Sequence, residues 1–119
     1  MKFLFLLLFI LACKKELTYT KEDLFKIAQA ADPTVAMVLP RNMNEGVTCS
    51  SYPDGCLSAH IVKVRELNLI AIEYLTEKEA ILASKKIRGY YTRNWVLDDV
   101  SGEPLLEEFV TKYLEAKKP

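Results

Sequence analysis

The chain has 119 residues, of which 50% are hydrophobic and 27% are charged, and its 16 basic and 16 acidic residues cancel to a net charge of zero. This length fits one domain, and the composition excludes a disordered or collagen-like chain. Because a nucleic-acid-binding surface needs an excess of basic residues, we expect no nucleic-acid partner.

The first thirteen residues, MKFLFLLLFILAC, differ from the rest of the chain. Lys2 precedes ten apolar residues, Phe3 to Ala12, and Cys13 follows them. In a helix, ten residues at about 1.5 Å each cover roughly half of a hydrocarbon core of ~30 Å, so this run is too short to span a membrane. Its length and basic flank are typical of a secretory signal, and the alternative is a buried N-terminal helix.

The last four residues of this segment, Ile10-Leu11-Ala12-Cys13, resemble the lipobox of bacterial lipoproteins. The resemblance implies cleavage before Cys13 and attachment of acyl chains such as palmitate, and two or three such chains anchor a protein durably. The chain then divides into a signal peptide over residues 1–12, a lipidated tether over 13–19 and a single domain over 20–119.

The same resemblance implies a location in the bacterial cell envelope, with the membrane as a partner through the lipid on Cys13. In some enteric bacteria, an Asp directly after the lipidated Cys retains a lipoprotein at the inner membrane. This chain has Lys14 at that position. We therefore favour the periplasmic face of the outer membrane over the inner membrane.

The first elements of the domain are predicted from capping residues and apolar runs. Thr20 and Asp23 approximate a capping box that begins a helix, and this helix ends before Pro33. The apolar run Thr34 to Leu39 predicts a short buried strand. The next segment, residues 41–57, is irregular and long enough to be a functional loop.

Cys49 and Cys56 are the two cysteines that remain if Cys13 carries lipid. The intervening PDG sequence favours a turn that brings them together. Because exported proteins keep disulfides, we predict a structural disulfide that contributes about 2–3 kcal/mol. A redox pair would have the narrower CxxC spacing, and a zinc site would need more ligands than these cysteines and His60, so we expect no metal and no cofactor.

The rest of the chain completes an α+β pattern. The remaining expected elements are two strands within residues 58–75 joined by a turn at 66–68, a helix over 76–87 with Gly89 as its C-cap, one strand over 90–100 and a final helix from Pro104. We therefore predict a small antiparallel sheet of about four strands packed with three helices.

The strand that begins at Leu67 is expected to be central and buried on both faces, because it is almost continuously apolar. Ile70 and Ile72 would then face helices on one side. Leu69 and Ala71 would point to the other side, where the first helix is the best candidate to cover them.

Glu73-Tyr74 at the end of this strand, the spaced Ala80 and Ala83, and Gly89 form a pattern that resembles the second half of an RNA-recognition motif. The resemblance spans Leu67 to Val96 and implies ferredoxin-like packing. The preceding part departs from it, because the disulfide segment stands where that family has a helix between its first two strands. The function of the family does not carry over, because the positions that stack RNA bases in that family hold Leu69 and Ala71 here.

Two clusters of side chains have two interpretations each. Tyr90 and Trp95 form either part of the core or an aromatic surface for a protein partner. Asp98, Asp99 and Glu103 form either a solvated turn with a helix cap or a set of calcium ligands.

Catalytic motifs are missing from the sequence. There is no G-x-S-x-G, P-loop or H-E-x-x-H pattern, and nothing in the sequence places a serine beside His60. We therefore predict a non-enzymatic envelope lipoprotein that serves as a protein-interaction or scaffold module. The alternative is a small-ligand or ion-binding protein that uses the disulfide loop at residues 41–57.

Overall fold

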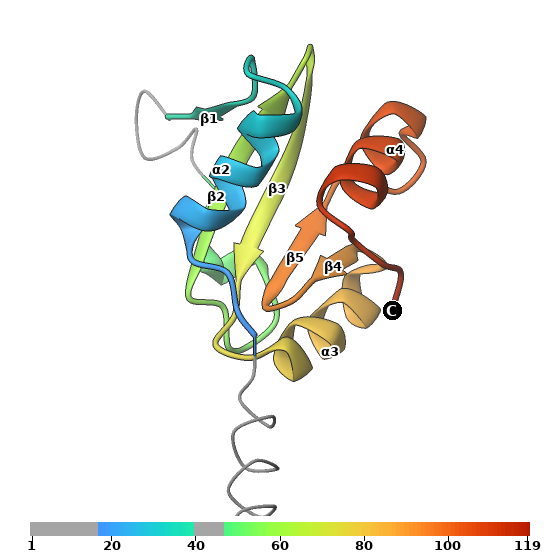
Figure 1. The fold of residues 1–119 in the computed structure, drawn as a ribbon. Helices are drawn as coiled ribbons and strands as arrows, with labels where there is room; N and C mark the ends of the chain where they lie inside the picture. The colour runs from blue at the N-terminus through green and yellow to red at the C-terminus, as the bar shows by residue number, and fades with distance from the viewer. Residues whose placement is uncertain (1–16, 40–46) are drawn as a thin grey trace, which may run out of the picture.

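Three α-helices and five strands make up the part of the chain that the structure, a computed structural model, describes: residues 17–39 and 47–119 (Figure 1). The helices are α2 (Lys21–Ala31), α3 (Glu77–Ile87) and α4 (Pro104–Tyr113), with a 3-10 turn η1 at Cys49–Ser51. The predicted signal peptide and Cys13 lie outside the described residues.

The strands form one antiparallel sheet in the order β1-β2-β3-β5-β4. Their bounds are β1 (Ala36–Val38), β2 (Ser58–Val64), β3 (Leu67–Glu73), β4 (Tyr90–Thr92) and β5 (Trp95–Asp98). The α+β prediction is confirmed, but the described sheet has five strands rather than about four.

The additional strand arises because residues 90–98 fold into a hairpin rather than a single strand. Thr92 pairs directly with Trp95, so Arg93 and Asn94 form a two-residue turn. Arg93 adopts a φ of 49°, the left-handed conformation that tight hairpin turns require. The sequence signal was weak because Gly usually occupies such a turn.

The chain order also differs from the ferredoxin-like β-α-β-β-α-β arrangement. Between β1 and β2 the described residues contain η1 and the disulfide rather than an α-helix, and α3 leads into a hairpin rather than a single strand. The described elements therefore depart from the ferredoxin-like order between β1 and β2, as the sequence indicated, and again after α3, although β3 and α3 follow one another as that resemblance implied.

The helix starts agree with the sequence. The Thr20 hydroxyl accepts from the Asp23 N–H, and the Asp23 side chain accepts from the Thr20 N–H, which completes the predicted capping box. Thr76 caps α3 by accepting from the Glu79 N–H, and Pro104 occupies the first turn of α4.

Gly89 has a different role from the predicted one. The left-handed residue after α3 is Arg88, with a φ of 56°. Gly89 is instead buried against β5, where a Cβ atom would lie 3.1 Å from the Leu97 carbonyl oxygen. A side chain there would be crowded, because the backbone after α3 approaches β5 so closely that the Leu97 carbonyl would have to shift by a few tenths of an ångström.

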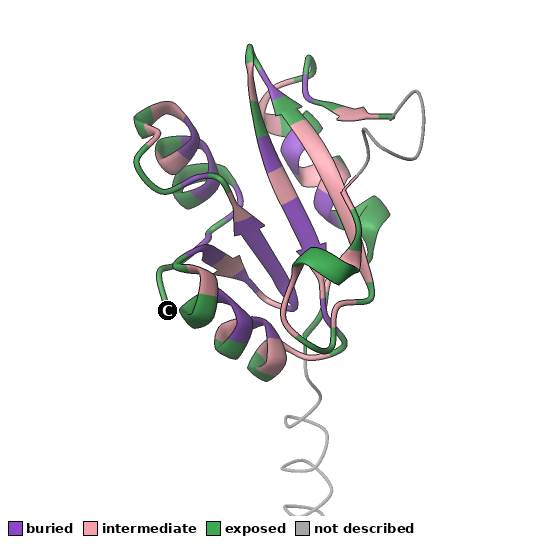
Figure 2. Cartoon of the chain, turned by 180° about the vertical axis from the view of Figure 1, so that it is seen from behind, coloured by how far each residue is buried: buried purple, intermediate pink, exposed green. Residues whose placement is uncertain are grey.

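Helices cover both faces of the sheet. Leu69 and Ala71 belong to a buried cluster with Leu24 and Ala28 of α2 and with residues of α4. Ile72 belongs to a second cluster on the opposite face, with residues of α3. The prediction that α2 covers Leu69 and Ala71 is confirmed, and Figure 2 shows β3 and β5 buried over much of their length.

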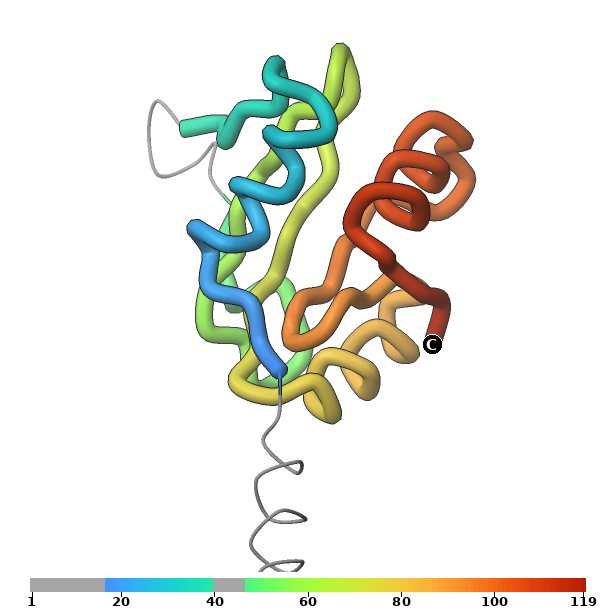
Figure 3. The backbone as a smooth tube through the Cα atoms, viewed as in Figure 1, coloured from blue at the N-terminus to red at the C-terminus, as the bar shows by residue number. Residues whose placement is uncertain are grey.

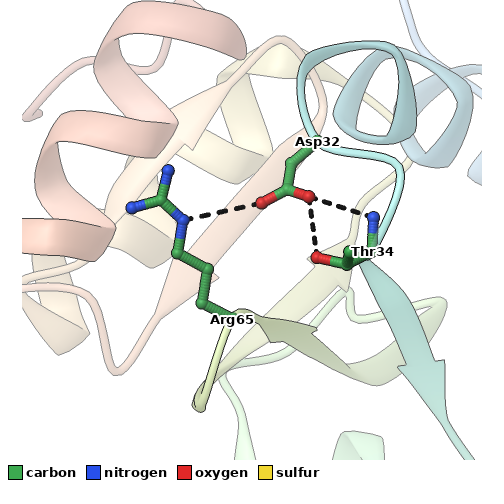
Figure 4. A network of polar contacts seen from close by, with 3 residues as sticks. All are labelled: Asp32, Thr34 and Arg65. Carbon is green, nitrogen blue, oxygen red and sulfur yellow. Dashed lines mark hydrogen bonds and ion pairs between the residues drawn. The ribbon is translucent and has the colours of Figure 1, made fainter.

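A polar network fixes the end of α2 (Figure 4). An Asp32 carboxylate oxygen accepts hydrogen bonds from the Thr34 N–H at 3.0 Å and hydroxyl at 2.7 Å. The other oxygen lies 3.6 Å from Arg65 Nε in the β2–β3 turn. The hydrogen bonds from Thr34, helped by Arg65, hold the pKa of Asp32 below its ordinary value.

Candidate functional site

The space between α2 and α4, above the middle of the sheet, is the first candidate site. It holds a cavity of about 30 Å³ whose lining is almost wholly apolar and includes Leu24, Phe25, Leu69, Trp95 and Phe109. Small-molecule sites occupy roughly 300–1,000 Å³. The cavity is therefore a packing gap that no metabolite could enter unless α2 and α4 moved apart.

Polar side chains meet at one end of this cavity, which His60 and Lys21 help to line. Ser58 and Glu73 face each other across β2 and β3, and the Ser58 hydroxyl donates to a Glu73 carboxylate oxygen at 2.9 Å. His60 Nε2 lies 3.1 Å from the same Ser58 oxygen. The sequence did not reveal this contact, although Ser58 and His60 are two residues apart and therefore share one strand face.

The order of these hydrogen bonds differs from that of a Ser-His-acid triad. In a triad the imidazole lies between the serine and the acid and accepts the serine proton. Here Ser58 lies in the middle and directs its proton to Glu73, so His60 Nε2 must donate to Ser58. In this arrangement His60 cannot act as the base for Ser58.

The surroundings of His60 favour the neutral imidazole. Burial lowers the pKa of His60 below its ordinary value, and the nearby charge of Lys21 lowers it further, while Glu73 acts in the opposite direction. The imidazole also lies near Trp95, with ring centroids 6.1 Å apart. These contacts make His60 a packed core-edge residue and a pH-sensitive one.

Tyr90 and Trp95 do not form a surface for a partner. Trp95 is 1% exposed and Tyr90 is 4% exposed, and both belong to the cluster under α2 and α4. The Tyr90 hydroxyl donates to a Glu107 carboxylate oxygen at 2.9 Å. Their burial assigns both residues to the core interpretation rather than to a partner surface.

The disulfide is present between Cys49 and Cys56, whose Cα atoms are 5.5 Å apart. It closes a short loop on the α3 face of the sheet, where Tyr52 and Cys56 pack against the buried cluster. The Tyr52 hydroxyl donates to an Asp98 carboxylate oxygen at 3.0 Å, which fastens the loop to β5. Burial and this bond to Asp98 raise the pKa of Tyr52.

A shallow groove of about 120 Å³ lies between this loop and the sheet edge. Val47 lines it together with residues of β1 and β2, including Met37 and Ile61. Its volume is less than half that of a typical ligand site. Residues 40–46, which make up much of the predicted 41–57 loop, lie outside the described residues.

The acidic residues near the β5–α4 connection do not converge on one point. Asp98 accepts from Tyr52, whereas Asp99 adopts a left-handed φ of 62° and Glu103 is the residue before α4. Burial, followed by the charge of Asp98, raises the pKa of Asp99. Within residues 17–39 and 47–119, no group of three or more His, Cys, Asp or Glu side chains could hold a metal ion.

A hollow of about 360 Å³ beside the C-terminus of α3 has the volume of a ligand site. Lys85, Arg88 and Lys118 line it with Gly89 and Ser101. Cations are common where a helix ends, because they lie near the partial negative charge of its last carbonyls. No buried polar side chain lines the hollow, so we regard it as solvated surface.

The segment that enters the domain is fixed to the end of the sheet. The Tyr19 N–H donates to the Asn94 side-chain oxygen at 2.7 Å, and the Tyr19 carbonyl accepts from Trp95 Nε1 at 2.9 Å. Asn94 is buried and its amide also donates to the Tyr74 carbonyl at 3.0 Å. Figure 3 shows this first described segment beside the β3–α3 connection.

Comparisons with protein-family models, curated proteins and solved structures found no match to this chain. Among the described residues, no helix combines the length and apolar character that crossing a membrane requires.

Proposed function

We propose that this chain is a lipid-anchored protein of the bacterial cell envelope, held to the membrane by acyl chains on Cys13. The lipobox-like residues ending at Cys13 support this proposal. The hydrogen bonds of Tyr19 fix the point at which the chain enters the domain. Six residues from Cys13 to Tyr19 reach at most ~20 Å. A lipidated Cys13 would therefore hold the domain close to the bilayer and in a restricted orientation.

The experiment is a Cys13→Ser substitution in the full chain. Wild-type protein is expected to incorporate labelled palmitate and to sediment with membranes, whereas the variant should do neither and should keep its uncleaved N-terminus. A Cys49→Ser, Cys56→Ser variant is the matched control, because it changes cysteines without touching the proposed lipid site. Palmitate incorporation that is equal in wild type and Cys13→Ser would contradict the proposal.

We further propose that the domain is a non-enzymatic protein-interaction or scaffold module. Two features of the described residues support this function. The cavity next to the polar cluster is too small for a substrate, and Ser58 is bonded in an order that does not activate it through His60. Crosslinking in intact cells should give a discrete higher-mass species, and that species should disappear in the Cys13→Ser variant.

Small-ligand or ion binding at the 41–57 loop is the second candidate. The groove lined by Val47, Met37 and Ile61 is the observation that favours it. Replacing Val47 with Arg would fill that groove without touching the disulfide. If this candidate is right, the substitution should abolish a ligand-induced rise in the thermal midpoint and leave crosslinking unchanged.

A further inference from the structure

Four strand ends share one end of the sheet. β2 begins at Ser58, β3 ends at Glu73, β5 begins at Trp95 and β4 ends at Thr92, and the pairing aligns these four residues in one row. Residues immediately before or after these strand ends therefore extend beyond the sheet on the same side. We call this side the entry end, because the chain enters the domain here at Tyr19.

Exposed leucines gather at the entry end. Six large apolar side chains are exposed in the described part of the chain: Leu17, Leu39, Leu57, Leu75, Leu82 and Tyr113. Leu57 directly precedes β2, and its N–H donates to the Glu73 carbonyl. Leu75 follows Tyr74, which bonds to Asn94, and Leu17 lies two residues before Tyr19, which bonds to the same Asn94.

These three leucines are exposed to a degree that is unfavourable in water, at 65% for Leu17, 55% for Leu57 and 66% for Leu75. Scattered exposed leucines are ordinary in soluble proteins. Leu17, Leu57 and Leu75 all lie at the end of the sheet where the chain enters, so half of the six exposed large apolar side chains of the described residues are concentrated there. An apolar surface of this kind is stabilised when it leaves water.

The position of Cys13 identifies what covers this surface. Four residues from Cys13 to Leu17 span at most ~14 Å, so a lipid on Cys13 would hold the entry end against the bilayer. We propose that Leu17, Leu57 and Leu75 rest in the membrane interface, so that the domain lies on the bilayer rather than standing away from it. This inference rests on the proposed lipidation of Cys13.

Other side chains at the entry end suit an interface but do not make it a basic one. Tyr19 is partly buried and carries the Arg93 guanidinium 4.0 Å above its ring, and Tyr and Arg side chains are common at membrane surfaces. The first turns of α2 and α3 hold four acidic residues, Glu22, Asp23, Glu77 and Glu79, against Lys21 and Lys78, so these turns would not attract anionic lipid. Apolar contact should therefore carry the interaction, and raised salt should not abolish it.

Trp95 supplies a built-in probe of the distance to the membrane. It is the single tryptophan of the chain, and its indole N–H bonds to Tyr19 at the entry end. The lipidated full chain would be reconstituted into vesicles of phosphatidylethanolamine and phosphatidylglycerol that contain a dansyl-labelled lipid. Energy transfer from Trp95 to the dansyl headgroups then reports how closely the domain approaches the bilayer.

Wild type is expected to show strong energy transfer, and a Leu57→Glu, Leu75→Glu variant should show clearly less. Leu39→Glu is the matched control, because Leu39 is 81% exposed but follows β1 at the sheet edge, and its energy transfer should equal that of wild type. All three proteins should float with the vesicles through their lipid. Unfolding of the double variant would be recognised by circular dichroism, and the single Leu75→Glu variant would then replace it.

Three results would overturn the inference. Equal energy transfer in all variants that float would show that the leucines do not touch the bilayer, while leaving the lipidation proposal intact. Failure of wild-type protein to float would overturn both, because nothing would then hold the entry end at the membrane. A protein crosslinked to the Leu75 region, with energy transfer unchanged by the substitutions, would assign the surface to that protein instead.

Discussion

On the face of the sheet that carries α2 and α4, fifteen buried residues form a continuous apolar cluster, whereas the α3 face has five. The larger cluster includes Trp95, Leu69 and Phe109, and a small cavity remains between its helices. The smaller cluster packs Ile72, Tyr74 and Val96 of the sheet side against the short Ala80 and Ala83 of α3, and Tyr52 and Cys56 of the disulfide loop pack against it. One face is thus stabilised by buried volume, and the other by close backbone approach and a covalent link.

The largest effects should come from deleting side-chain volume on β3, where neighbouring residues serve opposite faces. Leu69 is 2% exposed and Ile72 is 0% exposed. Leu69→Ala and Ile72→Ala should each lower the free energy of unfolding by about 2–5 kcal/mol, because each leaves a cavity. Chemical denaturation would measure both.

Leu82→Ala is the control for this pair, because Leu82 is 52% exposed on α3 and the change should stay within about 0.5 kcal/mol. A midpoint for Leu69→Ala that equals the control would mean that α2 does not cover this face in solution. Only the α3 face of β3 would then be covered by a helix.

Loss of the disulfide should lower the free energy of unfolding by less than these core substitutions, and it should weaken the packing on the α3 face. The Cys49→Ala, Cys56→Ala variant should lose about 2–3 kcal/mol of unfolding free energy, because its unfolded chain is no longer closed into a loop. Wild-type protein under reducing conditions should match the variant. If reduction leaves the denaturation midpoint unchanged, the loop does not support this face.

Substitutions that enlarge a side chain should be tolerated better on the face with the cavity, between α2 and α4, than on the closely packed α3 face. Gly89→Ala should destabilise the domain by about 1–3 kcal/mol, because its Cβ would lie 3.1 Å from the Leu97 carbonyl oxygen. Val62→Ile adds one methylene beside the cavity between α2 and α4 and should change stability by less than about 1 kcal/mol. Equal losses for the two variants would show that both faces are packed equally tightly.

The sequence predicted the elements whose signals are local. The start of α2 at Thr20 and of α3 at Thr76 followed from capping residues, and the disulfide followed from counting cysteines. The coverage of Leu69 followed from a strand that is apolar at successive positions. In each case a few adjacent residues carry the physical cause.

Features that depend on distant contacts were not predictable in the same way. The hairpin at Arg93 has no glycine to mark it, and it exists because Asn94 bonds to Tyr19 and Tyr74, far away in sequence. The contact of Ser58 with Glu73 depends on strand register. Aromatic residues such as Trp95 suit a core and a binding surface equally, so only burial separates the two.

The smallest expected effect concerns the pH dependence of the α2–α4 face, which His60 introduces. Burial and Lys21 lower the pKa of His60 in the folded state, so the unfolded chain binds a proton first as the pH falls. Stability should therefore be greatest above the unfolded pKa of about 6.5 and should decrease as the pH falls below it. The opposing charge of Glu73 limits the size of this effect.

The pH dependence of stability separates the two faces, because the lowered pKa of His60 and the raised pKa of Asp99 change the free energy of unfolding in opposite directions with pH. Asp99, beside Asp98 near the α3 face, has a raised pKa in the folded state. Its contribution to the stability of the domain is therefore lost as the pH rises through that folded-state pKa. The denaturation midpoint of wild type should be lower at pH 5.5 than at pH 7.5. The difference should be smaller in His60→Gln, because the glutamine keeps a hydrogen-bond donor for Ser58 but does not titrate. Asp99 is common to both proteins, so the difference between them isolates His60. Parallel pH dependence in wild type and His60→Gln would mean that the imidazole is solvated, and that α2 does not seal this end of the cavity.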